Sequence, residues 1–148
     1  LVAGRTYAAN GNSIVGMPEE TRELIFDTIE FNRRLPPEVE STGAFIFAPY
    51  HGTPLRDLAI QKGYLDPASI VSLDRLEGSM LDMPQLARDE IIGLARTFSF
   101  YVKMPASRHP EIRMAERLDA AGDGQFAMLQ AQFQQECLGA GVLDPLDA

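Results

Sequence analysis

The sequence predicts an α/β fold whose first half contains the strands and whose second half is helical. Two short apolar runs, residues 12–15 and 43–48, have the length of buried strands, and a helical pattern separates them. A strand–helix–strand unit of this length normally joins two parallel strands through a helix that covers the sheet. Beyond about residue 85 the apolar side chains recur at helical spacing, and no further strand pattern follows.

The first strand, residues 12–15, ends at a loop that contains a glycine and a proline. In residues 21–35 the apolar side chains recur at helical spacing, which predicts a helix with one face on the sheet. The members of that face are Leu24, Ile25, Thr28, Ile29, Asn32 and Leu35. Glu19 and Glu20 lie near the start of this helix, where the helix dipole favours acidic residues. We therefore expect both to stabilise the start of the helix.

Two consecutive prolines stop this helix, and the second strand follows at residues 43–48. A short helix is expected after it, because Thr53 suits the capping position and Pro54 the first helical position. Gly63 suits the end of that helix, since glycine readily adopts the left-handed conformation of a helix terminus.

The second half predicts three helices, at residues 85–102, 110–120 and 124–138. The stretch 121–124 contains two glycines and is interpreted as a connection between the last two helices. His109 precedes a proline in a polar segment, and we expect it in a solvent-exposed turn.

Composition excludes several classes of protein. The 148 residues carry a formal charge of −8, and this acidic balance argues against binding to nucleic acid or to an anionic membrane surface. No apolar run approaches the roughly 20 residues of a spanning helix, and no signal peptide is evident, so a cytoplasmic protein is expected. The single cysteine, Cys137, excludes an internal disulfide and a multi-thiolate metal site; it is expected to be a small buried hydrophobe.

Two segments resemble a known family. Residues 12–21 read N-S-I-V-G-M-P-E-E-T and resemble the fifth-strand motif of radical S-adenosylmethionine (radical SAM) enzymes, commonly I-V-G-L-P-G-E-T. Residues 45–55 read F-I-F-A-P-Y-H-G-T-P-L and resemble the sixth strand and its loop, often F-x-F-T-P-Y-P-G-T-x-L. Glu19 departs from the usual glycine and His51 from the usual proline. Residues 81–84 and 97–105 resemble the C-terminal extension of radical SAM enzymes that carry a cobalamin-binding domain.

The resemblance implies that the chain is a C-terminal fragment of such an enzyme. Residues 1–75 would form the last part of a TIM-like radical SAM barrel, and residues 76–148 a helical extension. Ile14 would pack on the adenine of S-adenosylmethionine, and glycine at position 16 would let the backbone approach the ligand. The residues that the resemblance assigns to cofactor binding are Ile14, Val15, Gly16, Glu20, Phe47, Ala48 and Pro49.

The resemblance also implies cofactors and partners outside this chain. In the family, three closely spaced cysteines bind a [4Fe-4S] cluster whose electron cleaves S-adenosylmethionine to a 5′-deoxyadenosyl radical. Those cysteines would lie upstream of Leu1, so this chain would hold no metal ligand and would be inactive alone. Its partners would be the missing N-terminal half of the barrel, a small-molecule substrate and, in the cobalamin-associated subgroup, a cobalamin-binding domain.

Two other functions are kept as alternatives. The acidic, helix-rich stretch 82–138 would suit a non-catalytic interaction module built on an α/β remnant. A small hydrolase would use His51 as a general base with a carboxylate, because histidine titrates near neutral pH. The sequence contains no nucleophile elbow, metal-ligand pair or ordered triad, and this argues against the hydrolase. His51 is the one candidate catalytic residue of the chain.

Overall fold

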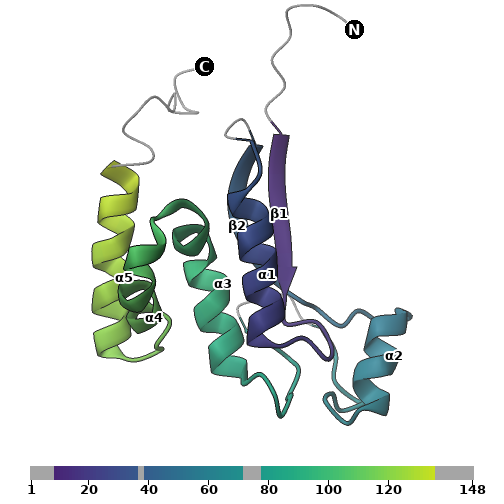
Figure 1. Ribbon diagram of the computed structural model, residues 1–148. Coiled ribbons are helices and arrows are strands. Elements are labelled where there is room, and N and C mark those ends of the chain that lie inside the picture. The colour runs from purple at the N-terminus through teal and green to yellow at the C-terminus, as the bar shows by residue number, and fades with distance from the viewer. Residues whose placement is uncertain (1–8, 37–38, 72–77, 136–148) are drawn as a thin grey trace, which may run out of the picture.

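The computed structural model describes residues 9–36, 39–71 and 78–135. Two parallel strands, β1 (Ala9–Val15) and β2 (Val39–Ile46), are joined by the helix α1 (Arg22–Arg33), which confirms the predicted strand–helix–strand unit. The remaining elements are α2 (Pro54–Gln61), α3 (Arg88–Lys103), the single 3₁₀ turn η2 (Ala106–Arg108), α4 (His109–Ala115) and α5 (Ala120–Phe133). Figure 1 shows α1 and α3 next to the strands, α4 and α5 beyond α3, and α2 projecting on the other side.

The two strands form a sheet with one buried and one uncovered face. Ile14 lies opposite Phe45 and Val15 opposite Ile46, with a register shift after Gly11. Val15 is fully buried beneath the helices, whereas Ile14 is 53% and Phe45 63% exposed. Side chains alternate between the two faces of a strand, so the helices cover the Val15 face and leave the Ile14 face open. Parallel sheets are normally covered on both faces.

The core lies between the covered face of the sheet and the helices α1, α3, α4 and α5. Its largest fully buried side chains are Tyr101, Phe98, Ile25, Ile29, Leu81, Leu86, Ile91, Leu94, Ile112 and Leu129. Burying each isoleucine or leucine contributes about 1.5–3 kcal/mol to folding. Asn32 is also buried on this face, and its amide donates to the Ser13 hydroxyl at 3.2 Å. Leu24 was expected here but is half exposed: it lies on the outer flank of α1, seven residues before the exposed Phe31.

Side-chain caps set the starts of α1 and α2, and the cap of α2 at Thr53 confirms the prediction. The Thr21 side chain accepts a hydrogen bond from the Leu24 amide, and Thr53 does the same for Arg56. Pro54 occupies the first turn of α2. Gly63 follows this helix with a φ of 74°, the left-handed conformation that favours glycine.

The predicted connection at residues 121–124 is wrong, because these residues form the start of α5. Asp119 caps the helix, and its carboxylate accepts a hydrogen bond from the Gly122 amide at 2.8 Å. A Cβ atom at Gly122 would lie 1.9 Å from the Arg117 carbonyl oxygen. Glycine therefore allows a close helix–loop contact here and does not interrupt the helix. The preceding helix, α4, correspondingly ends at Ala115 and not near residue 120.

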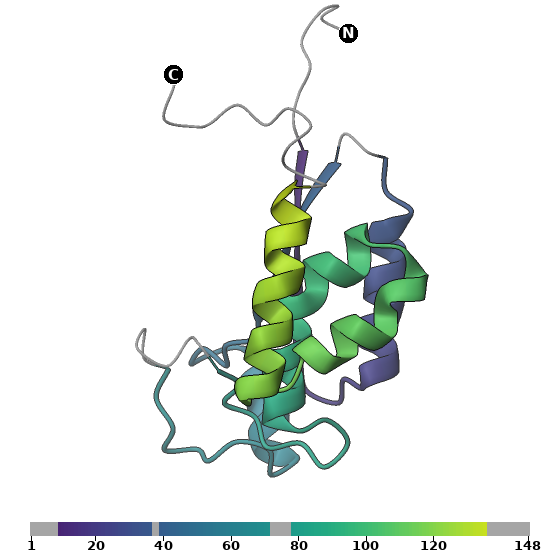
Figure 2. The same ribbon diagram turned by 90° about the vertical axis from the view of Figure 1, so that its left-hand side faces the viewer.

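Two features hold the second half on α3. Figure 2 shows α4 and α5 lying next to α3. The Arg96 guanidinium donates to the carbonyl oxygens of Ala115 and Arg117 and pairs with Asp123 at 2.8 Å. Gly93 packs so closely on α4 that an added Cβ would lie 2.4 Å from the Glu116 carbonyl oxygen. Charge-assisted hydrogen bonds and close backbone contact thus fix α4 and α5 on α3.

His109 does not lie in an exposed turn as expected. It begins α4, is half buried, and its ring packs edge-on against Tyr101 with centroids 5.0 Å apart. Its Nε2 atom is buried and has no hydrogen-bond partner within the part of the chain that the structure describes. Burial lowers the pKa of His109, and the nearby charge of Arg33 lowers it further.

Among the described residues, no helix combines the length and apolar composition needed to cross a membrane. The expected division near residue 75 and the expectation for Cys137 both fall outside the described ranges.

Replacing Gly93 by alanine is expected to destabilise the fold by about 2–3 kcal/mol, because the new methyl group meets a backbone oxygen that cannot yield. Gly124→Ala is the matched control: a Cβ there meets no atom within 4 Å, so alanine should stabilise α5 by about 0.5–1 kcal/mol. Urea unfolding followed by circular dichroism measures both. Equal effects of the two substitutions would contradict the close packing of α3 on α4.

Stability is expected to fall as the pH drops from about 7 towards 5, because His109 takes up a proton more readily in the unfolded chain, where its pKa is near 6.5. His109→Phe keeps the ring contacts and should remove this part of the pH dependence. His51→Phe alters the other histidine, which is exposed, and should leave the dependence intact. Thermal unfolding at stepwise pH compares the three proteins, and identical pH slopes would refute the role of His109.

Candidate functional site

A cavity of about 470 Å³ opens where both strands end. We call it the strand-end groove and define it by its lining residues, which are Ile14, Phe45, Ile46, Phe47, Ala48, Tyr50, Thr53 and Leu55. Most of this lining is apolar or aromatic, and Ile14, Phe45, Tyr50 and Leu55 are exposed. Cavities of 300–1,000 Å³ with such walls are typical of small-molecule sites.

The wall after β2 is held by main-chain bonds and one buried arginine. The Phe47 amide donates to the Val15 carbonyl at 2.8 Å, and the Tyr50 amide donates to the Ala48 carbonyl at 2.9 Å. Arg56 is 3% exposed. Its guanidinium donates to the carbonyl oxygens of Pro49, Pro67 and Ser69 at 3.0, 3.0 and 2.8 Å.

Two neighbouring main-chain groups of this wall stay available. Within the described ranges, neither the Phe47 carbonyl nor the Ala48 amide takes part in a hydrogen bond between residues. The two groups are the ends of one trans peptide unit and point in opposite directions, so only one of them can face the groove.

The loop after β1 supports the groove from behind. The Glu20 carboxylate is buried and accepts hydrogen bonds from the amides of Gly16 at 2.5 Å and Met17 at 3.1 Å. Burial raises the pKa of Glu20, while the two amide donors oppose that rise. Gly16 has a φ of 81°, and a Cβ there would lie 2.8 Å from the Ile91 side chain. These residues shape the loop, and the Glu20 Oε2 atom accepts both of its amide hydrogen bonds.

The predicted cofactor residues thus separate into two groups. Ile14, Phe47 and Ala48 line the groove together. The others, Val15, Gly16, Glu20 and Pro49, lie in the core or in the supporting loops. His51 is exposed and is not part of the lining, so its role as a general base stays a prediction.

Sequence reasoning missed several residues of the groove. Phe45, Tyr50 and Leu55 belong to the second motif, and alternation along a strand places Phe45 on the face of Ile14. That alternation was a usable signal. No sequence signal marks the role of Arg56, because its partners are main-chain carbonyl oxygens that the local sequence does not identify.

Glu19 has an unusual backbone. Its φ of 67° makes it the non-glycine residue with positive φ among the described residues, in a backbone conformation that favours glycine. The left-handed conformation costs a residue with a Cβ about 1–2 kcal/mol. The Glu19 carboxylate pairs with the Lys62 ammonium at the end of α2, and this partner raises the pKa of Lys62. Both side chains are about half exposed, so solvent and salt screen the pair and it contributes little to stability.

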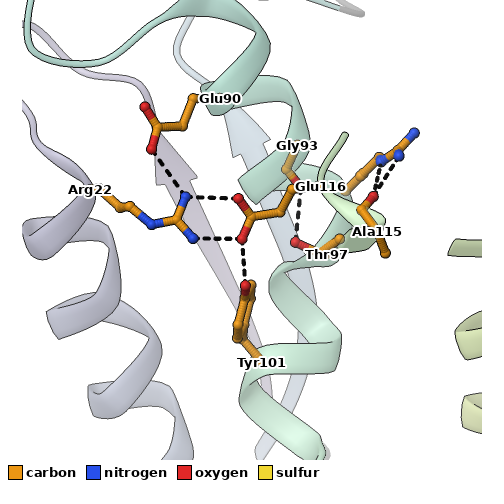
Figure 3. Close-up of polar contacts among 8 residues, drawn as sticks. Arg22, Glu90, Gly93, Thr97, Tyr101, Ala115 and Glu116 are labelled. Carbon is orange, nitrogen blue, oxygen red and sulfur yellow. Dashed lines mark hydrogen bonds and ion pairs between the residues drawn. The ribbon is translucent and has the colours of Figure 1, made fainter. Parts of the chain in front are cut away.

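Apart from the groove, a polar cluster lies between α1, α3 and the end of α4 (Figure 3). Arg22 donates to both Glu116 carboxylate oxygens at 2.6 and 2.7 Å, and to Glu90 at 3.1 Å. The Tyr101 hydroxyl also donates to Glu116. The hydrogen bond to Glu116 raises the pKa of Arg22, and burial followed by the same carboxylate raises that of Tyr101. Arg22 and Glu116 satisfy each other, so the cluster acts in helix packing.

Within the described ranges, no group of three or more histidine, cysteine, aspartate or glutamate side chains could hold a metal ion. Comparison with protein-family models, curated proteins and solved structures finds no match to this chain. The candidate site therefore depends on its own geometry, which is an apolar groove at the ends of two parallel strands.

Arg22→Met is expected to destabilise the chain by about 3 kcal/mol, because it leaves the buried Glu116 carboxylate without its cation. Arg117→Met is the control, since Arg117 and its partner Asp119 are both about half exposed. It should change the free energy of unfolding by less than about 0.5 kcal/mol. Chemical denaturation measures both, and a loss at Arg22 no larger than the control would refute the structural role of the pair.

Proposed function

We propose that this chain is the C-terminal part of a radical SAM enzyme and that the strand-end groove binds the adenosyl group of S-adenosylmethionine. The observation that carries the proposal is the convergence of two sequence motifs on one cavity. The first motif contributes Ile14, and the second, about 30 residues later, contributes Phe47 and Ala48. Neither motif was identified from the cavity.

The chemistry of the groove suits an adenine ring. Ile14, Phe47 and Tyr50 offer apolar and aromatic surface for the faces of a flat ring. One end of the peptide unit between Phe47 and Ala48, either the carbonyl or the amide, can face the groove and form a hydrogen bond with one polar atom of the adenine edge. The site also follows the rule that parallel α/β folds bind ligands at the carboxyl ends of their strands.

The uncovered sheet face supports assignment to a partial TIM-like barrel. In a barrel, one face of each strand points to the interior and the helices cover the other. Here α1 and α3 cover the Val15 face, whereas Ile14 and Phe45 remain exposed. We infer that further strands outside this chain complete the interior and close the groove.

The residues present do not fit the iron–sulfur cluster, since no ligand set for a metal lies within the described ranges. We therefore assign to this chain only the binding and orientation of the adenosyl group. The cluster, held elsewhere in the enzyme, would supply the electron for reductive cleavage, and a cobalamin domain would likewise lie outside this chain. The substrate is a small molecule, and such reductive chemistry suits the cytoplasm.

A helical interaction module is the second candidate function. Met114, Leu118 and Met128 are 47%, 42% and 57% exposed on or beside α4 and α5, and exposed apolar side chains are frequent at partner-binding surfaces. The parent reading frame separates the two functions. A CxxxCxxC segment roughly a hundred or more residues upstream, a distance set by barrel size, favours the enzyme.

Nuclear magnetic resonance tests the groove directly. Titration of the ¹⁵N-labelled chain with S-adenosylmethionine is expected to shift the Ile14, Phe47 and Ala48 amides, with millimolar affinity because the groove is open on one side. Ala48→Trp fills the groove and should abolish these shifts. Met128→Trp adds the same side chain at an exposed position of α5 and should leave them unchanged. Chemical-shift changes that persist in the Ala48→Trp variant would contradict adenosyl binding in the groove. An absence of shifts in the parent chain would contradict it as well.

A further inference from the structure

The helix α2 stands apart from the other helices and projects beside the carboxyl ends of the strands (Figure 1). Its start lines the strand-end groove through Thr53 and Leu55. Its other end, at Lys62, pairs with Glu19 in the loop after β1. One short helix thus connects the groove wall to the loop of the neighbouring strand.

The remaining contacts of α2 differ in kind from this ion pair. Arg56 bonds to carbonyl oxygens on both flanking segments, so α2 and residues 49–69 form one unit. Ala59 and Leu65 pack in the core. Of the ion pairs among the described residues, Glu19–Lys62 alone joins α2 to another element. The buried side chains hold the unit on the core, and the exposed pair is its ionic contact with the loop after β1.

The Glu19–Lys62 pair is poorly explained by stability of the fold. The left-handed backbone of Glu19 costs more free energy than an exposed ion pair returns. A glycine would avoid that cost at the same φ. Strained residues that persist in spite of their cost are found at ligand-binding and switching segments.

We propose that the Glu19–Lys62 pair is a latch that holds α2 in the position where Thr53 and Leu55 form one wall of the strand-end groove. Releasing the pair lets α2 move relative to the sheet and loosens that wall. The pair is weak and screened by salt, so the two positions of α2 are close in free energy. The latch acts on the same groove as the proposed function. It rests on that function only for the identity of the ligand.

Hydrogen–deuterium exchange of the α2 amides tests the latch without a ligand. Lys62→Met and Glu19→Gln are expected to speed exchange in residues 54–61 about two- to fivefold, while the amides of α3 keep their protection. High salt should speed exchange in the parent chain but not in Glu19→Gln. The exchanged pair, Glu19→Lys with Lys62→Glu, should restore the protection.

Glu19→Gly separates a latch from an ordinary stabilising contact. It relieves the strained backbone and breaks the pair, so the melting temperature should rise by about 2–4 °C while α2 exchanges faster. A purely stabilising role predicts a lower melting temperature together with faster exchange. Unchanged α2 exchange in both Lys62→Met and Glu19→Gly would overturn the latch.

A ligand titration extends the test and keeps the two proposals distinguishable. If S-adenosylmethionine binds the parent chain, Lys62→Met should weaken its affinity about two- to fivefold, and equal affinity would count against the latch. If S-adenosylmethionine shifts no amide in the parent chain, the proposed function fails. The exchange experiment then decides the latch alone.

Discussion

The arrangement of the helices depends on one ion pair, Arg22 with Glu116. Arg22 begins α1, Glu116 follows α4, and Tyr101 of α3 donates to the same carboxylate, so three helices meet at one buried anion. A buried charge is tolerated only beside its partner. This requirement fixes the ends of α1 and α4 on α3. The close contact of Gly93 with the Glu116 backbone is possible only in that arrangement.

Because all the helices that pack on the sheet lie on one side, the groove is a consequence of the packing. The covered face takes Val15 and the isoleucines of α1 into the core. The opposite face keeps Ile14 and Phe45 exposed, and the loop after β2 turns over its end to form a wall. The uncovered face of the sheet therefore supplies apolar surface to the strand-end groove.

Sequence predicted the features that depend on neighbours along the chain. The parallel strand–helix–strand unit, the cap Thr53 and the turn at Gly63 follow from periodicity and backbone preference. Glycine misled at position 122, where a close contact and not a break requires it. Helical spacing likewise could not tell which flank of α1 turns outward, so Leu24 was misplaced.

For the site, the motifs identified Ile14, Phe47 and Ala48 but not the groove itself. Burial of Arg56 and the pairing of Arg22 with Glu116 join residues distant in the chain, and a single sequence carries no signal for such contacts. Glu20 was assigned to the ligand because its motif position lies at the strand end. Its carboxylate binds the loop amides, a contact that becomes visible only in three dimensions, and its assignment to the ligand stays a prediction.

The left-handed backbone of Glu19 also bears on how this loop can change over generations. Glutamate and glycine codons differ by a single middle base, and this backbone accepts glycine without rearrangement. One point mutation can therefore add or remove the charge that faces Lys62 while the loop keeps its shape. The contact between the loop after β1 and the end of α2 can therefore be gained or lost in a single step, at a position where every residue with a Cβ strains the turn.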